Sequence, residues 1–207
     1  MNQQQAQQTA SFGAHEIMEL HEVLCETINC INTFQLFQQH VTDPGLRQIL
    51  DRQLDFLGNE YNNIVNTLHA QGRGQAVPYR AQKAGTPKYG LRQPAPEAPN
   101  ASPQQLDDRD IAACMLSSAK CSATMRMHAA LECADPTLRG IMLQAAQNSA
   151  EMAYETWNFM NQKGYYQVPT MMQQTTQTMI NVYQPGNENN LMAGNVPQTG
   201  QTWNPLQ

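Results

Sequence analysis

A chain of 207 residues is long enough for one domain with a hydrophobic core or for two very small domains. Charged residues make up only 14% of it and the formal net charge is −5, which argues against nucleic acid or an anionic membrane as a partner. No apolar run approaches the roughly 20 residues of a membrane-spanning helix, and the N-terminal residues lack the basic and apolar segments of a secretory signal. We therefore expect a protein that stays inside the cell that makes it.

The chain starts with a polar, glutamine-rich segment, residues 1–12, which we expect to be disordered. Residues 13–72 predict a first helical hairpin. Its first helix should cover residues 14–41, and its second should follow a turn at Asp43-Pro44 and continue to Gly72. Apolar residues at three- and four-residue steps predict the buried face of each helix. These are Ile17, Leu20, Leu24, Ile28, Ile31 and Phe34 in the first helix, and Leu46, Ile49, Leu50, Leu57, Tyr61, Ile64 and Leu68 in the second.

Residues 73–106 are rich in proline and glycine, a composition that excludes a long regular element. A connection of this length is unusual in a compact bundle unless it crosses from one end to the other. We therefore expect a crossover linker. Its lysines, Lys83 and Lys88, together with the abundant glutamine of the chain, suggest covalent glutamine–lysine cross-linking as a hypothesis.

Residues 107–166 predict a second helical hairpin with its turn at Asp135-Pro136. The aspartate oxygen can accept hydrogen bonds from free backbone N–H groups, and the fixed φ of proline suits the first helical position. Gly164 should end the second helix. The predicted buried face of that helix consists of Leu138, Ile141, Met142, Ala145, Ser149, Met152, Thr156, Phe159 and Met160.

The first helix of the second hairpin is rich in small residues, which let two backbones approach closely. Tight packing inside the monomer is one interpretation of this composition, and a helix-to-helix contact between subunits is the other. Residues 167–207 form a polar tail, with one short helix possible at about residues 171–183. The small residues are Ala112, Ala113, Ser117, Ser118, Ala119, Ser122, Ala123, Ala129 and Ala130.

The two hairpins are copies of one unit. The segment Asp43-Pro44-Gly45-Leu46-Arg47 matches Asp135-Pro136-Thr137-Leu138-Arg139 at an offset of 92 residues, and the same offset superposes the apolar faces and the terminal glycines. One hairpin cannot bury its own apolar face, but two packed together can. The fold class is therefore predicted as all-α: a ferritin-like four-helix bundle of two duplicated hairpins with a long central crossover and disordered termini.

A ferritin-like arrangement raises the hypothesis of a dimetal centre, in which two helices supply a Glu and two supply Glu-x-x-His. The offset of 92 places Met152 where Glu60 lies and Ile111 where Glu19 lies, and neither hairpin has Glu-x-x-His in its second helix. We therefore predict a closed apolar core with no catalytic, cofactor-binding or metal-binding residues.

One polar cluster lies at the start of the first helix. His15, Glu19 and Glu22 share a helix face, so a single divalent ion is geometrically possible. The alternative is a solvated helix start, with its acids in the positive field of the helix dipole.

Lys120 lies among small residues and could be a buried cation paired with Glu132 or Glu151. Such a pair fixes helix register more often than it performs chemistry. His128 is a single histidine on an alanine-rich helix and is interpreted as an exposed or hydrogen-bonded side chain. The five cysteines form no C-x-x-C pair and are interpreted as buried reduced thiols, with intermolecular disulfides as the alternative; they are Cys25, Cys30, Cys114, Cys121 and Cys133.

A family resemblance lies in the second hairpin. The segment DRDIAACMLSSAKCSATMRMHAALECADPTLR, followed by AYETWNFMNQKGYYQVP, resembles the spore coat protein F family of endospore-forming Firmicutes. The resemblance is close over residues 107–169 and looser in the first hairpin from HEIMELHEVL onward. It implies a structural protein made in the mother cell and deposited in the spore coat, where its partners are other coat proteins.

The leading hypothesis is thus a non-enzymatic coat component that associates with other coat proteins and possibly with itself, and with neither nucleic acid nor membrane. A metal-dependent ferritin-like oxidase or catalase that protects the spore is the alternative. A third possibility is an adaptor that recruits other proteins.

Overall fold

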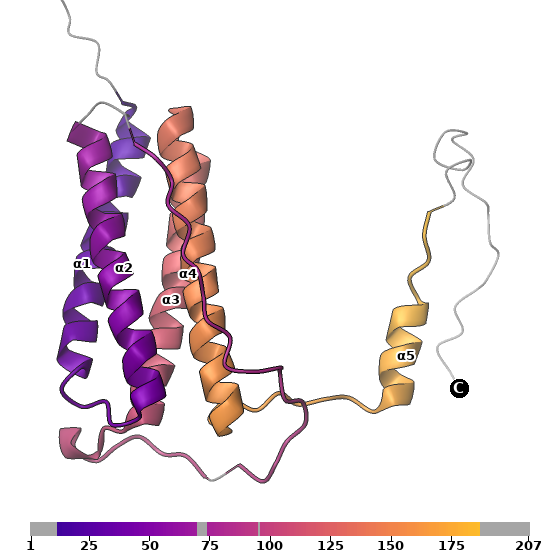
Figure 1. The fold of residues 1–207 in the computed structure, drawn as a ribbon. Helices are drawn as coiled ribbons and strands as arrows, with labels where there is room; N and C mark the ends of the chain where they lie inside the picture. The colour runs from indigo at the N-terminus through magenta and orange to yellow at the C-terminus, as the bar shows by residue number, and fades with distance from the viewer. Residues whose placement is uncertain (1–11, 70–73, 95, 187–207) are drawn as a thin grey trace, which may run out of the picture. The chain divides into compact units, whose positions relative to one another are not determined.

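The protein is all-α, as predicted. The computed structural model describes residues 12–69, 74–94 and 96–186. Within these ranges the chain divides into two units, Met1–Val168 and Pro169–Gln207. The described residues form five α-helices and one short 3-10 helix (Figure 1): α1 Ala14–Phe37, α2 Pro44–His69, η1 Pro103–Gln105, α3 Asp108–Glu132, α4 Pro136–Lys163 and α5 Gln173–Asn181.

Four of these helices, α1 to α4, form the first unit, and α5 belongs to the second. None of the nine residues of α5 is buried. Among the residues that the structure describes, no helix combines the length and the apolar character that crossing a bilayer requires. The disorder predicted for the N-terminal segment, the stop at Gly72 and the tail beyond residue 186 concern positions outside the described residues, except Phe12.

Both predicted helix starts carry the same cap. The Asp135 Oδ1 accepts hydrogen bonds from the backbone N–H groups of Thr137 and Leu138, both at 2.9 Å. The Asp43 Oδ1 accepts them from Gly45 and Leu46, at 2.8 and 3.2 Å. Each aspartate satisfies N–H groups that a helix start leaves free. The prediction of the two corners is confirmed.

The end of α4 is also as predicted. Gly164 takes a left-handed conformation with φ of 83°, where a side chain would be strained, and the N–H of Tyr165 turns back to the Met160 carbonyl at 2.8 Å. Lys163 in the last turn donates to the Asp43 Oδ2 at 2.5 Å and so ties the end of α4 to the start of α2.

The two hairpins hold each other through a reciprocal pair of acids. Glu16 of α1 accepts a hydrogen bond from the backbone N–H of Asp135, at the corner of the second hairpin. Asp108 of α3, which corresponds to Glu16 at the offset of 92, accepts one from the N–H of Asp43 at 3.0 Å, at the corner of the first. Asp108 also accepts from the N–H of Thr42 at 2.8 Å. The duplication therefore extends to the contacts between the copies.

These contacts fix the directions of the helices. The start of α1 lies at the α3–α4 corner, and the end of α4 lies at the start of α2, so α1 is antiparallel to α3 and α2 to α4. Because α2 and α3 then run in the same direction, their connection must travel the length of the bundle (Figure 1). The crossover is thus explained, whereas the ferritin-like relation stays a prediction.

The buried faces agree with prediction for α4 and disagree for α1. All nine residues predicted for α4 are buried. In α1 the buried face is rotated: Ile17 and Ile28 are 45% and 42% exposed, while Glu16 and Thr27 are buried. In α2 the buried set includes Gln53 and Glu60 beside the predicted leucines and isoleucines. The prediction of a wholly apolar interior is therefore wrong.

The small residues of α3 face mainly inward. Ala112, Ala119, Ser122, Ala129 and Ala130 are buried, and α3 packs more extensively against α4 than any other pair of helices does. This corresponds to the first of the two interpretations, tight packing inside the monomer.

Candidate functional site: a buried polar network

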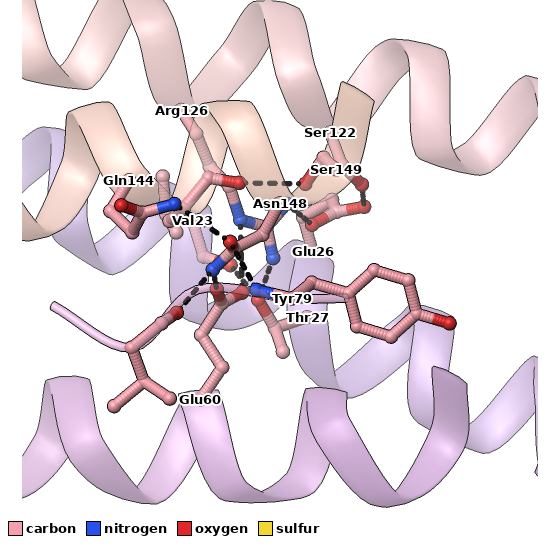
Figure 2. A network of polar contacts seen from close by, with 12 residues as sticks. Val23, Glu26, Thr27, Glu60, Tyr79, Ser122, Arg126, Gln144, Asn148 and Ser149 are labelled. Atoms are coloured by element: carbon pink, nitrogen blue, oxygen red, sulfur yellow. Dashed lines mark hydrogen bonds and ion pairs between the residues drawn. The ribbon is translucent and has the colours of Figure 1, made fainter. Parts of the chain in front are cut away.

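A guanidinium lies in the middle of the bundle. Arg126 of α3 has no exposed surface, and its Nη1 donates to the Glu26 Oε2 of α1 at 3.0 Å. Its Nη2 donates to the Thr27 hydroxyl oxygen at 2.8 Å, and that hydroxyl donates onward to the Val23 carbonyl at 2.7 Å. The Ser122 hydroxyl donates to the other oxygen of Glu26. Figure 2 shows these side chains converging from facing helices.

A second carboxylate faces the same guanidinium from α2. The Glu60 Oε2 lies 3.6 Å from the Arg126 Nε, and the Glu60 Oε1 accepts from the Asn148 Nδ2 at 2.8 Å. Burial raises the pKa of the Glu60 carboxyl above its ordinary value, although Arg126 and the Asn148 amide oppose that shift. One buried cation therefore joins acids from α1 and α2 to α3.

Asn148 extends the network to residues 74–94, which we call the strap because they lie along α4 (Figure 1). Its Oδ1 accepts from the backbone N–H of Tyr79 at 2.8 Å, and its Nδ2 donates to the carbonyl of Val77, also at 2.8 Å. One amide thus reads both main-chain groups of an extended segment.

Glu155 of α4 is the second anchor of the strap, and it is only 1% exposed. Its Oε1 accepts from the Arg52 Nη2 at 2.8 Å and from the backbone N–H of Gln82 at 2.6 Å. Its Oε2 accepts from the Tyr79 hydroxyl at 2.5 Å and from the Gln53 Nε2 at 3.1 Å. Burial and the Glu155 carboxylate raise the pKa of Tyr79 far above its usual range, so the phenol stays a neutral donor.

Two further asparagines of α4 continue the row. The Asn158 side chain accepts from the N–H of Gly85 at 3.0 Å and donates to the carbonyl of the same residue at 2.8 Å. The Asn161 side chain does the same with Lys88, at 2.7 and 3.0 Å. We call Asn148, Glu155, Asn158 and Asn161 the amide row, since its members bind main-chain groups of the strap. Its residues lie on one face of α4, at helical spacing.

The strap also covers a cavity of about 270 Å³ between α2 and α4. Phe56 and Ile141 supply apolar walls, the strap contributes Ala76 and Val77, and the polar groups are Asn59, Glu60, Asn63, Gln144 and Asn148.

The residues singled out from the sequence lie elsewhere. Lys120 is exposed, with its Nζ 5.4 Å from the centre of the Tyr166 ring, so the hypothesis of a buried lysine is wrong and Arg126 is the buried cation. Arg126 follows Ser122 at i+4 and precedes Ala129 at i+3, two small buried residues. That phase was the available signal, and the sequence reasoning missed it.

The predicted cluster on α1 is divided by its neighbours. His15 lies 3.4 Å from a Glu132 oxygen, and Glu19 lies 3.6 Å from the His128 Nε2, so both pairs join α1 to α3. Glu22 lines an open groove between the same two helices. Among the described residues no three His, Cys, Asp or Glu side chains are grouped as metal ligands.

All five cysteines lie in described helices or at their ends and are free thiols. Cys30 and Cys133 are buried, and burial raises the pKa of Cys30 to about 12 and that of Cys133 to about 11. Cys25, Cys114 and Cys121 are exposed. The interpretation of five buried thiols is therefore wrong for these three.

The chemistry of the network is that of a fixed cation bridging acids. Glu26 and Glu60 direct their oxygens at a guanidinium that cannot deprotonate. In a dimetal bundle the corresponding inner carboxylates bind ions. Here the guanidinium occupies the space between the two acids, so this donor set does not fit a dimetal centre.

Comparisons with known proteins agree on one family. A family model described as the Coat F domain matches residues 107–169, which contain α3, α4, Arg126 and the whole amide row. The chain is 31% identical over 175 residues to the spore coat protein F-like protein YhcQ of Bacillus subtilis (strain 168), covering 84% of this chain and 81% of that protein.

A solved structure has the same fold. It is the crystal structure of a protein assigned provisionally as a spore coat protein of Bacillus halodurans C-125, with a TM-score of 0.57 and 14% identity. The match covers 78% of this chain and 95% of the other. At that identity the likeness establishes the fold alone.

Proposed function

The chain belongs to the spore coat protein F family, and from that membership we propose that it is a structural, non-enzymatic component of the bacterial endospore coat. It is made in the mother cell, deposited on the developing spore and associated there with other coat proteins. The observation that carries the proposal is the relationship to the Bacillus subtilis protein over most of both chains.

The interior of the bundle supports a structural role. Its charged groups satisfy one another: Arg126 binds Glu26 and Glu60, and Glu155 binds Arg52 and the strap. Groups held in this way stabilise the position of four helices and a connection, and their proximity is accounted for without a substrate. A building block requires this kind of rigidity.

Association in the coat would use the exposed reactive groups. Cys25, Cys114 and Cys121 are exposed thiols and can form intermolecular disulfides. Lys83 and Lys88 are also exposed, although the Lys83 Nζ lies 5.6 Å from the Tyr154 ring centre and the Lys88 Nζ donates to the Gln162 carbonyl at 3.0 Å. Both lysines remain open to covalent glutamine–lysine cross-linking from the solvent side.

Fractionation of spores tests the proposed location. The chain, expressed from its own promoter with a small epitope tag, should be recovered in the coat extract of purified spores and be absent from the decoated core. Immunogold labelling of thin sections should place the tag over the coat. Recovery in the core or in the vegetative cytoplasm would contradict the proposal.

Mass spectrometry and reduction test the cross-links separately. Digested coats should contain isopeptides at Lys83 or Lys88, and extraction of the chain should increase with reductant. A Cys25→Ser, Cys114→Ser, Cys121→Ser triple variant should be extracted equally with and without reductant. If wild-type extraction is insensitive to reductant and isopeptides are missing, association is non-covalent.

A further inference from the structure

The amide row is built to bind a main chain. Asn158 and Asn161 each bind the N–H and the C=O of one strap residue, and Asn148 does so for Tyr79 and Val77. Contacts of this kind recognise an extended backbone with little regard to its side chains, as an added strand is recognised by a sheet edge. Tyr79, which is 6% exposed and bound to Glu155, is the side-chain anchor that sets the register.

The receiving surface and the bound segment come from different halves of the chain. Residues 107–169, matched by the family model, contain α3 and α4 with the amide row, whereas the strap precedes them. The contacts that join α1 and α2 to α3 and α4 also cross this division, from Glu16 to Asp135 and from Glu26 to Arg126. The second hairpin is therefore incomplete without the first hairpin and the strap.

The two halves are joined by an exposed, proline-rich segment. After the Gly90 N–H binds the Val168 carbonyl at 2.8 Å, the chain leaves α4 and reaches α3 through residues 91–107. Of those that the structure describes, every residue is exposed except Ser102 and Leu106, which are partly exposed. Prolines 94, 96, 99 and 103 favour an extended chain over a tight reversal. Fully extended, such a segment reaches about 56 Å.

From these observations we propose that the first hairpin and the strap of one copy pack on α3 and α4 of a second copy, with residues 91–107 as the hinge. The exchanged contacts are those of the monomer, so the two states differ mainly in the entropy of chain closure and of association. High local concentration favours exchange, because the competing intramolecular concentration of a linked segment is on the order of mM. This step rests on the proposed function, since a dense coat supplies that concentration.

Reciprocal exchange between two copies makes a closed dimer. Exchange in which each copy gives its first half to the next makes an open chain of copies. Both products use the amide row and the same hinge, and the second would connect many copies without any new interface.

A disulfide across the strap tests the proposal. A Cβ at Gly85 would lie 3.0 Å from the Gln162 side chain, so Gly85→Cys and Gln162→Cys are neighbours when the strap is bound. One population carries Gly85→Cys and a second carries Gln162→Cys, both with the five native cysteines replaced by serine or alanine. The two are unfolded, mixed, refolded over a range of protein concentrations and oxidised. We expect disulfide-linked heterodimers whose yield rises with concentration.

Two controls make the result decisive. Arg80→Cys replaces Gly85→Cys as an exposed strap position five residues away, and it should give only background dimers with Gln162→Cys. The single chain that carries both Gly85→Cys and Gln162→Cys should form the intramolecular disulfide at low concentration, which verifies the geometry. If that internal disulfide forms while heterodimers stay at the Arg80→Cys level up to millimolar protein, the exchange is contradicted.

Hinge length gives an independent measurement. Deleting residues 97–101 should raise the dimer fraction in size-exclusion chromatography, because a shorter hinge disfavours closure within one copy. An unchanged, wholly monomeric profile would contradict the proposal. Both measurements use purified protein, so their failure is distinguishable from failure of the coat assignment, which spore fractionation tests.

Discussion

The ends of the four-helix bundle and its middle differ in how they preserve the duplication. At the ends, Glu16 and Asp108 occupy equivalent positions and make equivalent contacts with the opposite corners. In the middle, the offset of 92 places Arg126 on Phe34, so a buried cation in one copy corresponds to a buried ring in the other.

This difference separates two kinds of interaction. The end contacts are backbone caps that any pair of such hairpins can use, and they define which ends meet. The central network is specific to one arrangement, because only one copy supplies the guanidinium and only α4 supplies the amide row. We infer that the ends define the repeat, while the middle determines how the two unlike halves recognise each other.

The largest effect is expected from removing the central cation. Arg126→Met should destabilise the protein by about 3–5 kcal/mol, because it leaves Glu26 and Glu60 without their counter-charge in the interior. Urea unfolding at pH 7 measures the change. Lys120→Met, on the same helix but exposed, is the matched control and should cost less than about 1 kcal/mol. Equal losses in the two variants would show that the middle is no more demanding than the surface.

The amide row should give an intermediate effect. Asn161→Ala removes the partner of both main-chain groups of Lys88 and of the Tyr166 carbonyl, a donor and two acceptors. We expect a loss of about 1–3 kcal/mol, together with faster hydrogen exchange at the Lys88 amide. Asn66→Ala is the control, since Asn66 is exposed on α2. Unchanged exchange at Lys88 would mean that the row does not hold the strap.

The end contacts should give smaller and equal effects. Glu16→Gln and Asp108→Asn each weaken a charge-assisted hydrogen bond to the opposite corner, at a cost of about 1 kcal/mol. The two sites lie at opposite ends of α3, so the double variant should equal the sum within about 0.5 kcal/mol. A strongly unequal pair would break the symmetry that the duplication implies.

Glu60 should make the middle sensitive to pH. Its pKa is raised in the folded protein, so its favourable contribution is complete below the ordinary value of 4.5 and is lost as pH rises through the folded pKa. Glu60→Gln should therefore gain stability relative to wild type between pH 4.5 and 7. Asp55→Asn, an exposed change on the same helix, should show no such trend. A constant difference for Glu60→Gln across this range would contradict the assignment.

Local rules predicted the parts of the fold that depend on neighbouring residues. The Asp135 cap, the Gly164 stop and the buried face of α4 follow from spacing and backbone preference. The face of α1 did not, because Ile17 and Ile28 are exposed and the positions that turn inward include Glu16 and Thr27. Those polar residues are buried because their partners, Asp135 and Arg126, come from the other hairpin.

The strap illustrates the same limit. Its prolines and glycines correctly exclude a regular element, but they do not indicate where an extended chain lies. Its position depends on asparagines some 70 residues away, which in α4 resemble ordinary polar positions. Likewise Arg126 was overlooked beside Lys120, because burial of a cation depends on acids that only the folded bundle brings together.

The central claim is that a guanidinium, rather than a metal pair, bridges the inner acids of a structural protein. Calorimetric titration of the purified chain with Fe²⁺ or Mn²⁺, with thermal unfolding followed in parallel, tests it most directly. We predict no stoichiometric binding and no change in the unfolding temperature. Uptake of two ions per chain that Glu26→Gln or Glu60→Gln abolishes would contradict the account and favour a metal-dependent enzyme.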